Sequence, residues 1–129
     1  MEILQKILNL TTPFFLELAQ ELLQIYRSPL YVYDSDILRK TILDSTKAFN
    51  YSHTKFHLPS VKNGNIALLK IFKSAGWGLH ANTPGDTCLG LNSVFDPRDI
   101  VYSGSNSNRE EMEQFLNWGV TTLNLDSIS

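Results

Sequence analysis

Strand-like and helix-like segments alternate along most of this 129-residue chain. Four short apolar runs, bounded by turn-forming residues, have the length of buried strands; they span residues 55–60, 78–81, 100–103 and 121–125. Between these runs, apolar residues recur at helical spacing in segments that begin near Ile66, at Pro84 and after Ser107 or Asn108. Strand–helix units joined by short turns predict an α/β fold, with a parallel sheet and helices outside it.

The N-terminal part follows a different pattern. It predicts a short helix at Ile3–Leu8 and a second helix with Thr12 as N-cap and Pro13 at its first position. A run of β-forming residues at Leu30–Tyr33 predicts a short strand, and Asp34 is expected to cap a helix that follows. The expected fold therefore includes N-terminal helices and a short N-terminal strand.

Size and charge limit the possible functions. The chain carries 11 Lys and Arg against 13 Asp and Glu, so its near-neutral charge does not point to nucleic acid or an acidic membrane surface. The length suits a single domain over residues 1–129, but it falls short of the roughly 200–250 residues of a complete eight-stranded α/β barrel. The single cysteine, Cys88, cannot form an internal disulfide, and Glu17 and Glu21 interrupt the N-terminal apolar run. We therefore expect a cytoplasmic protein without a membrane span.

A lysine follows the first predicted barrel-type strand, in FHLPSVKNGNIALLKIF at residues 56–72. Folds of this class place their chemistry just beyond the carboxyl ends of the strands, and a lysine amine there can form a Schiff base with a carbonyl cofactor. Alternatively, Lys62 is a solvated turn residue beside Asn63–Gly64, a common turn pair. The residues alone favour the turn.

Two further polar residues end predicted strands. His80 and Ser103 are candidate ligand contacts, although each is also compatible with an ordinary strand end or helix-capping loop. His53, His57 and Cys88 lack the spacing of metal ligands, so no metal site is expected.

Three segments, in order, resemble one enzyme family. They are SPLYVYDSDILRK at 28–40, IALLKIFKSAGWG at 66–78, and DPRDIVYSGSNSNREEMEQFLNWGVTTLNLDSIS at 96–129. Together they are similar to the pyridoxal 5′-phosphate-dependent ornithine/diaminopimelate/arginine decarboxylases, and most of all to its diaminopimelate decarboxylases.

The resemblance implies a barrel that binds pyridoxal phosphate, followed by a β-sandwich domain to which the strand at 30–33 would belong. Only the first half of the barrel is expected in these residues, and the family's glycine-rich phosphate loop lies in the other half. Lys62 would hold the cofactor, with His80 and Ser103 as further cofactor contacts. The implied substrate is an amino acid, the implied role is lysine biosynthesis, and the implied partner is the missing half or a second copy.

The chain also departs from the family pattern. Aligned without gaps, the family's Tyr-Ala-Val-Lys-Ala-Asn motif places Val61, not Lys62, at the lysine position. His80 stands where the family has an acidic residue, and Pro84 replaces a glycine. Two main hypotheses follow: a truncated or split decarboxylase that is inactive alone, and a non-catalytic relic or regulatory protein that pairs with a decarboxylase subunit or with itself. A stand-alone module that binds small molecules is a weaker alternative, because no dinucleotide or P-loop glycine motif is present.

Overall fold

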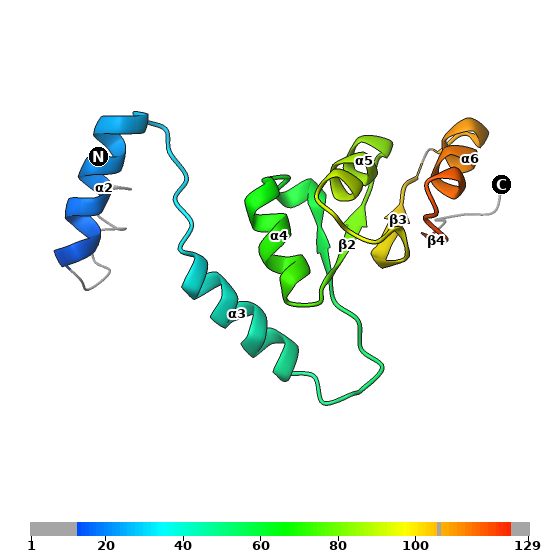
Figure 1. The fold of residues 1–129 in the computed structure, drawn as a ribbon, viewed down its shortest axis with the longest axis horizontal. Helices are drawn as coiled ribbons and strands as arrows, with labels where there is room; N and C mark the ends of the chain where they lie inside the picture. The colour runs from blue at the N-terminus through cyan, green and yellow to red at the C-terminus, as the bar shows by residue number, and fades with distance from the viewer. Residues whose placement is uncertain (1–12, 106, 125–129) are drawn as a thin grey trace. The chain divides into compact units, whose positions relative to one another are not determined.

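The computed structural model describes residues 13–105 and 107–124 (Figure 1). The helix expected at Ile3–Leu8 and the Thr12 cap lie outside these residues. The chain divides into two compact units, with the boundary between Tyr33 and Asp34. The single domain over residues 1–129 stays a prediction.

The first unit contains one described helix, α2, at Pro13–Tyr26. Its first described residue is the proline, whose fixed φ suits the first helical position. The strand predicted at Leu30–Tyr33 is wrong: residues 30–33 have no regular secondary structure. A strand needs a neighbour for its backbone hydrogen bonds, and no described strand pairs with this segment. Its apolar side chains are exposed, Tyr31 most of all at 85%.

The second unit opens with α3, at Ser35–Lys47. The Asp34 Oδ1 atom accepts hydrogen bonds from the backbone N–H groups of Asp36 (2.8 Å) and Ile37 (3.0 Å), which confirms the predicted cap. The Trp77 indole N–H donates to Thr46 Oγ1 at 3.0 Å, and the ring of Trp77 stacks on Phe56 with centroids 5.0 Å apart. Through these contacts α3 packs against the segments that lead into the first two strands of the sheet.

Four parallel strands form one sheet in the order β1-β2-β3-β4 (Figure 1). The strands are β1 at His57–Pro59, β2 at Gly78–Ala81, β3 at Ile100–Ser103 and β4 at Thr122–Asn124. Helices follow the first three: α4 at Ile66–Ser74, α5 at Pro84–Asn92 and α6 at Arg109–Asn117. Two 3-10 turns complete the unit, η1 at Ser60–Lys62 and η2 at Pro97–Asp99. The predicted α/β fold with a parallel sheet is therefore confirmed.

All three helices pack on the same face of the sheet, which we call the covered face. The core between this face and the helices is made of residues from the strands, the helices and the loops between them. They are Leu69, Leu79, Ala81, Phe95, Ile100, Tyr102, Phe115 and Val120. Because side chains alternate along a strand, the register places a second set on the opposite face: His57, Pro59, His80, Val101, Ser103, Thr122 and Asn124. We call this the open face, since its side chains are half-buried or exposed. In a closed α/β barrel the helices lie outside, so the open face corresponds to the barrel interior.

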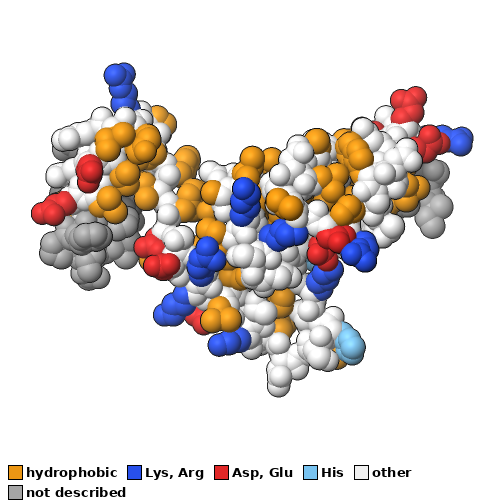
Figure 2. All heavy atoms as spheres, in the orientation of Figure 1, with side chains coloured by type: hydrophobic (Ala, Val, Ile, Leu, Met, Phe, Trp, Pro, Cys, Tyr) orange, Lys and Arg blue, Asp and Glu red, His pale blue; other side chains and the backbone are white. Residues whose placement is uncertain are grey.

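Apolar side chains also reach the surface of both units (Figure 2). Among them are Ile25 and Tyr26 in the first unit, and Phe49, Val61 and Val94 in the second. No helix in the described part of the chain is both long enough and apolar enough to cross a membrane.

Candidate functional site

Polar side chains gather at the carboxyl ends of the four strands. Ser60 follows β1, Asn82 follows β2, Ser103 ends β3 and Asn124 ends β4. Because the strands are parallel, their carboxyl ends lie along one edge of the sheet. This edge is where α/β proteins place their ligands.

Three of these residues form a hydrogen-bonded row across β2, β3 and β4. The Asn82 Nδ2 atom donates to the Ser103 backbone carbonyl at 2.7 Å, and the Asn124 Nδ2 atom donates to Ser103 Oγ at 3.2 Å. Ser103 and Asn124 are register partners, and Asn82 follows Ala81, the partner of Tyr102. Ser103 therefore stands at the centre of a row fixed from both sides.

His80 lies on the open face next to this row, two residues before Asn82 along the chain. It pairs with Pro59 on one side and with Val101 on the other, and its side chain is half-buried. Its backbone carbonyl accepts a hydrogen bond from Ser60 Oγ at 3.1 Å. The bond ties the start of η1 to β2, so the structure brings His80, Ser103 and the turn that carries Lys62 to the same end of the sheet.

Lys62 is the last residue of η1 and is exposed. Within the described ranges, its side chain makes no hydrogen bond or ion pair. The turn after it is held by its own residues: Asn63 Oδ1 accepts from the Asn65 backbone N–H, and Asn65 Oδ1 accepts from the Ala67 backbone N–H. The lysine is therefore a turn residue by position, with an amine open to solvent near the carboxyl end of β1.

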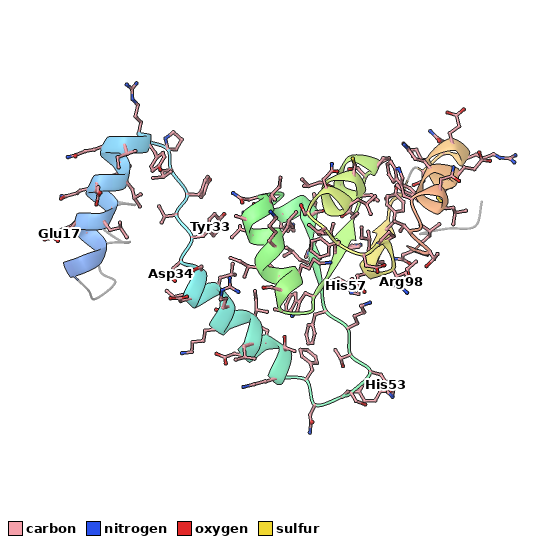
Figure 3. All side chains as sticks on the ribbon, viewed as in Figure 1. Glu17, Tyr33, Asp34, His53, His57 and Arg98 are labelled. Carbon is pink, nitrogen blue, oxygen red and sulfur yellow. The ribbon has the colours of Figure 1, made fainter. Side chains whose placement is uncertain are left out.

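The opposite end of the sheet has a charged cluster of its own. Lys55 Nζ lies 2.6 Å from Asp99 Oδ1, beside His57 at the start of β1. Burial and, secondly, the charge of Lys55 lower the pKa of His57 below its ordinary value of 6.5. Figure 3 shows His57 and Arg98 near the amino ends of β1 and β3, away from the strand ends that carry the polar row. Within residues 13–105 and 107–124, no three His, Cys, Asp or Glu side chains are grouped so that they could hold a metal ion.

The residues at the carboxyl edge suit the aldehyde and the oxygen atoms of a pyridoxal phosphate group, but not its ring nitrogen. They offer an amine for an aldehyde and hydroxyl, imidazole and amide groups for oxygen atoms. The open-face side chains include no carboxylate to pair with a ring nitrogen.

The helix N-termini at this edge do not offer a phosphate site. At α5, the Asp86 carboxylate accepts from the backbone N–H groups of Asn82 and Thr83. At α6, the Glu111 carboxylate accepts from the backbone N–H of Asn108. A phosphate approaching either helix would meet a negative charge where such groups usually find free N–H donors.

Sequence reasoning missed Ser60, Asn82 and Asn124. Each is a polar residue at the last position of a strand or just after it, and that position was the available signal. The bonds from Asn82 and Asn124 to Ser103, and from Ser60 to His80, depend on the register of neighbouring strands, which one sequence does not determine.

Comparison with known proteins finds relatives among the decarboxylases. No family model matches the chain. A diaminopimelate decarboxylase of Methanothermobacter thermautotrophicus is 34% identical over 113 residues, which are 86% of this chain and 26% of that protein.

Solved structures give the same result. The diaminopimelate decarboxylase of Helicobacter pylori, in complex with L-lysine, superposes with a TM-score of 0.75 and 26% identity, over 84% of this chain and 28% of that one. The ornithine decarboxylase of Entamoeba histolytica shares the fold, with a TM-score of 0.74 and 20% identity over 87% of this chain and 36% of that one.

The chain thus spans about a quarter of the length of the curated relatives it matches. The matches agree in sequence and in fold, and they include both diaminopimelate and ornithine decarboxylases. The chain is therefore homologous to a part of diaminopimelate decarboxylase, which it matches in sequence and in fold.

Proposed function

We propose that this chain is the first half of the barrel of a pyridoxal phosphate-dependent amino-acid decarboxylase, most like diaminopimelate decarboxylase, and that it is inactive alone. One observation carries the proposal. The four-stranded parallel sheet and its helices match a diaminopimelate decarboxylase over 84% of this chain while covering 28% of the enzyme.

Lys62 is the residue proposed to hold the cofactor. Its exposed amine follows β1 at the edge of the sheet that such folds use for chemistry. When bound, pyridoxal phosphate supplies an aldehyde that captures amines and a ring that accepts the electrons released on decarboxylation. His80 and Ser103 would contact the group from the open face, with an imidazole and a hydroxyl respectively.

The proposed inactivity follows from what the described half does not supply. A closed barrel has eight strands, whereas the sheet formed by the described residues has four, with two edges that no described strand pairs with. The carboxylates at the α5 and α6 N-termini disfavour a phosphate there. The remaining strands and the phosphate site would come from another part of a longer protein, from a second polypeptide or from a second copy of this chain.

Chemical trapping tests the role of Lys62. The purified chain is mixed with pyridoxal phosphate and treated with borohydride, and the modified lysines are mapped by mass spectrometry. We expect modification mainly at Lys62, loss of that signal in Lys62→Arg, and an unchanged signal in Lys70→Arg. Lys70 is a suitable control because it is also exposed but lies on α4. Equal modification of all exposed lysines would contradict the proposed role.

A second function has its own supporting observation. The open face carries no carboxylate, and Lys62 lies in a turn, so the fold could be retained for pairing with a decarboxylase subunit or with itself. This alternative predicts a stable complex whose activity does not depend on Lys62. An active complex that loses turnover in Lys62→Ala would rule it out.

A further inference from the structure

We propose that Asn124 and Asn82 are positioning residues that aim the Ser103 hydroxyl at an acceptor oxygen of a ligand bound on the open face. The inference rests on the proposed function, because it concerns the same carboxyl edge of the sheet. These residues lie outside the lysine motif, and the ligand that they would recognise is a small molecule with an anionic oxygen.

The hydroxyl of Ser103 has a proton that no described group accepts. A serine hydroxyl has one proton to donate and two lone pairs that accept. The Asn124 amide donates to Ser103 Oγ at 3.2 Å, so one lone pair is occupied. Within the described ranges this hydroxyl donates to no protein group. Its proton is therefore available to an incoming acceptor, and the bond from Asn124 restricts the directions in which it can point.

The backbone of Ser103 is also held in place. Asn82 holds the backbone of Ser103 through the 2.7 Å bond to its carbonyl. Asn82 is itself held, because its backbone N–H donates at 3.2 Å to Asp86 Oδ2, an atom of the residue that also forms the capping box of α5 with Thr83. The row is thus connected to a helix terminus, so the Ser103 backbone is fixed independently of the ligand.

The size and chemistry of the row suit a small anionic ligand. Neighbouring strands lie about 4.8 Å apart, so the three residues span roughly 10 Å, which is wide enough for one small ring with its substituents. A hydrogen bond from a neutral hydroxyl to a charged oxygen is stronger than one between neutral groups. A phosphate oxygen or a ring phenolate would both satisfy this chemistry.

Ligand titration of the full chain, followed by two-dimensional amide NMR, tests the inference. The probes are pyridoxal phosphate, pyridoxal, which lacks the phosphate, and inorganic phosphate. We expect shifts at the amides of Asn82, Ser103 and Asn124. We also expect about a tenfold weaker Kd in Ser103→Ala and in Asn124→Leu, which is the loss of about 1.4 kcal/mol from one charge-assisted hydrogen bond. Thr122→Val is the matched control, because Thr122 is on the same strand and face as Asn124 and makes no bond to Ser103.

Two further measurements separate positioning from a structural role. Asn124→Gln keeps an amide donor and should recover part of the affinity, whereas Asn124→Leu should not. Thermal unfolding should be nearly the same in wild type and Asn124→Leu, because Asn124 is exposed. If the Ser103→Ala effect appears with pyridoxal, the acceptor is on the ring; if it appears with inorganic phosphate, the acceptor is the phosphate.

Equal Kd values in wild type, Ser103→Ala and Asn124→Leu for all three probes would overturn the inference, as would the absence of shifts along the row. Trapping at Lys62 with Ser103-independent binding would refute this inference and leave the proposed function standing. Ser103-dependent binding without trapping at Lys62 would support the inference and refute the role proposed for the lysine.

Discussion

The two faces of the sheet differ in what they contact. On the covered face, Leu79, Ile100 and Tyr102 pack against the helices and are at most 2% exposed. On the open face, the neighbouring residues Val101 and Ser103 are half-buried, and Thr122 and Asn124 are exposed. The residues alternate along the same strands, so the difference comes from the packing of the helices and not from the strands themselves.

Stability thus depends mainly on the covered face, whereas the ligand contacts proposed above lie on the opposite face of the same strands. Parallel sheets are normally covered on both faces. Here the polar row and His80 occupy the face that a closed barrel would enclose, which agrees with the match to only part of a decarboxylase. Substitutions on adjacent residues should therefore have very different effects.

The largest difference is expected between two neighbours on β3. Ile100→Ala removes a fully buried side chain from the core and should lower the free energy of unfolding by about 2–5 kcal/mol. Val101→Ala, on the open face, should cost only about 1 kcal/mol, because that side chain is half-buried. Urea unfolding followed by tryptophan fluorescence measures both. Equal losses would mean that the open face is as well packed as the covered one.

A smaller difference is expected between two glycines of α5. A Cβ at Gly90 would lie 2.4 Å from Leu79 Cδ2 and 3.3 Å from Ile100 Cδ1, both in the core. Gly90→Ala should therefore cost about 1–3 kcal/mol through overpacking.

Gly85 is the matched control, because a Cβ there would come no closer than 3.6 Å to Thr83 Oγ1. Gly85→Ala should be neutral or stabilising by up to about 1 kcal/mol, since alanine has the higher helix propensity. If the Gly90→Ala protein melts at or above the wild-type temperature, α5 is not packed as closely against Leu79 and Ile100 as the structure indicates.

Much of this architecture follows from local sequence signals. The bounds of β2 and β3, the start of α5 at Pro84 and the Asp34 cap all agree with the sequence predictions. Asn108, one of two predicted caps, caps α6. These features depend on turn chemistry and apolar periodicity, which act over a few residues.

The remaining features depend on distant partners. Residues 30–33 have strand propensity but no described strand to pair with. Pro59, which has no N–H to donate, is tolerated in β1 because its nitrogen points away from β2. The bond from the Gly78 N–H to the Phe56 carbonyl sets which residues of β1 face β2, and Pro59 is not among those that would donate to it. The polar row needs the register of three strands, so the sequence predicted Ser103 but not Asn82 or Asn124.

The smallest expected effect concerns pH. The pKa of His57 is lowered in the folded protein, chiefly by burial and then by Lys55, with His80 acting in the same direction and Asp99 opposing it. The unfolded chain therefore binds this proton more readily, and the free energy of unfolding should fall as the pH drops below about 6.5. His57→Asn should make this dependence shallower between pH 8 and pH 5. A steeper dependence in His57→Asn would contradict the stated direction of the shift.

The most direct test of the account is whether this half alone catalyses. The purified chain is supplied with pyridoxal phosphate and diaminopimelate, and the release of carbon dioxide is measured beside the Lys62→Ala variant. The account predicts no release above background for either protein. Carbon dioxide release by the wild-type chain that disappears in Lys62→Ala would show that four strands suffice, and would contradict the account.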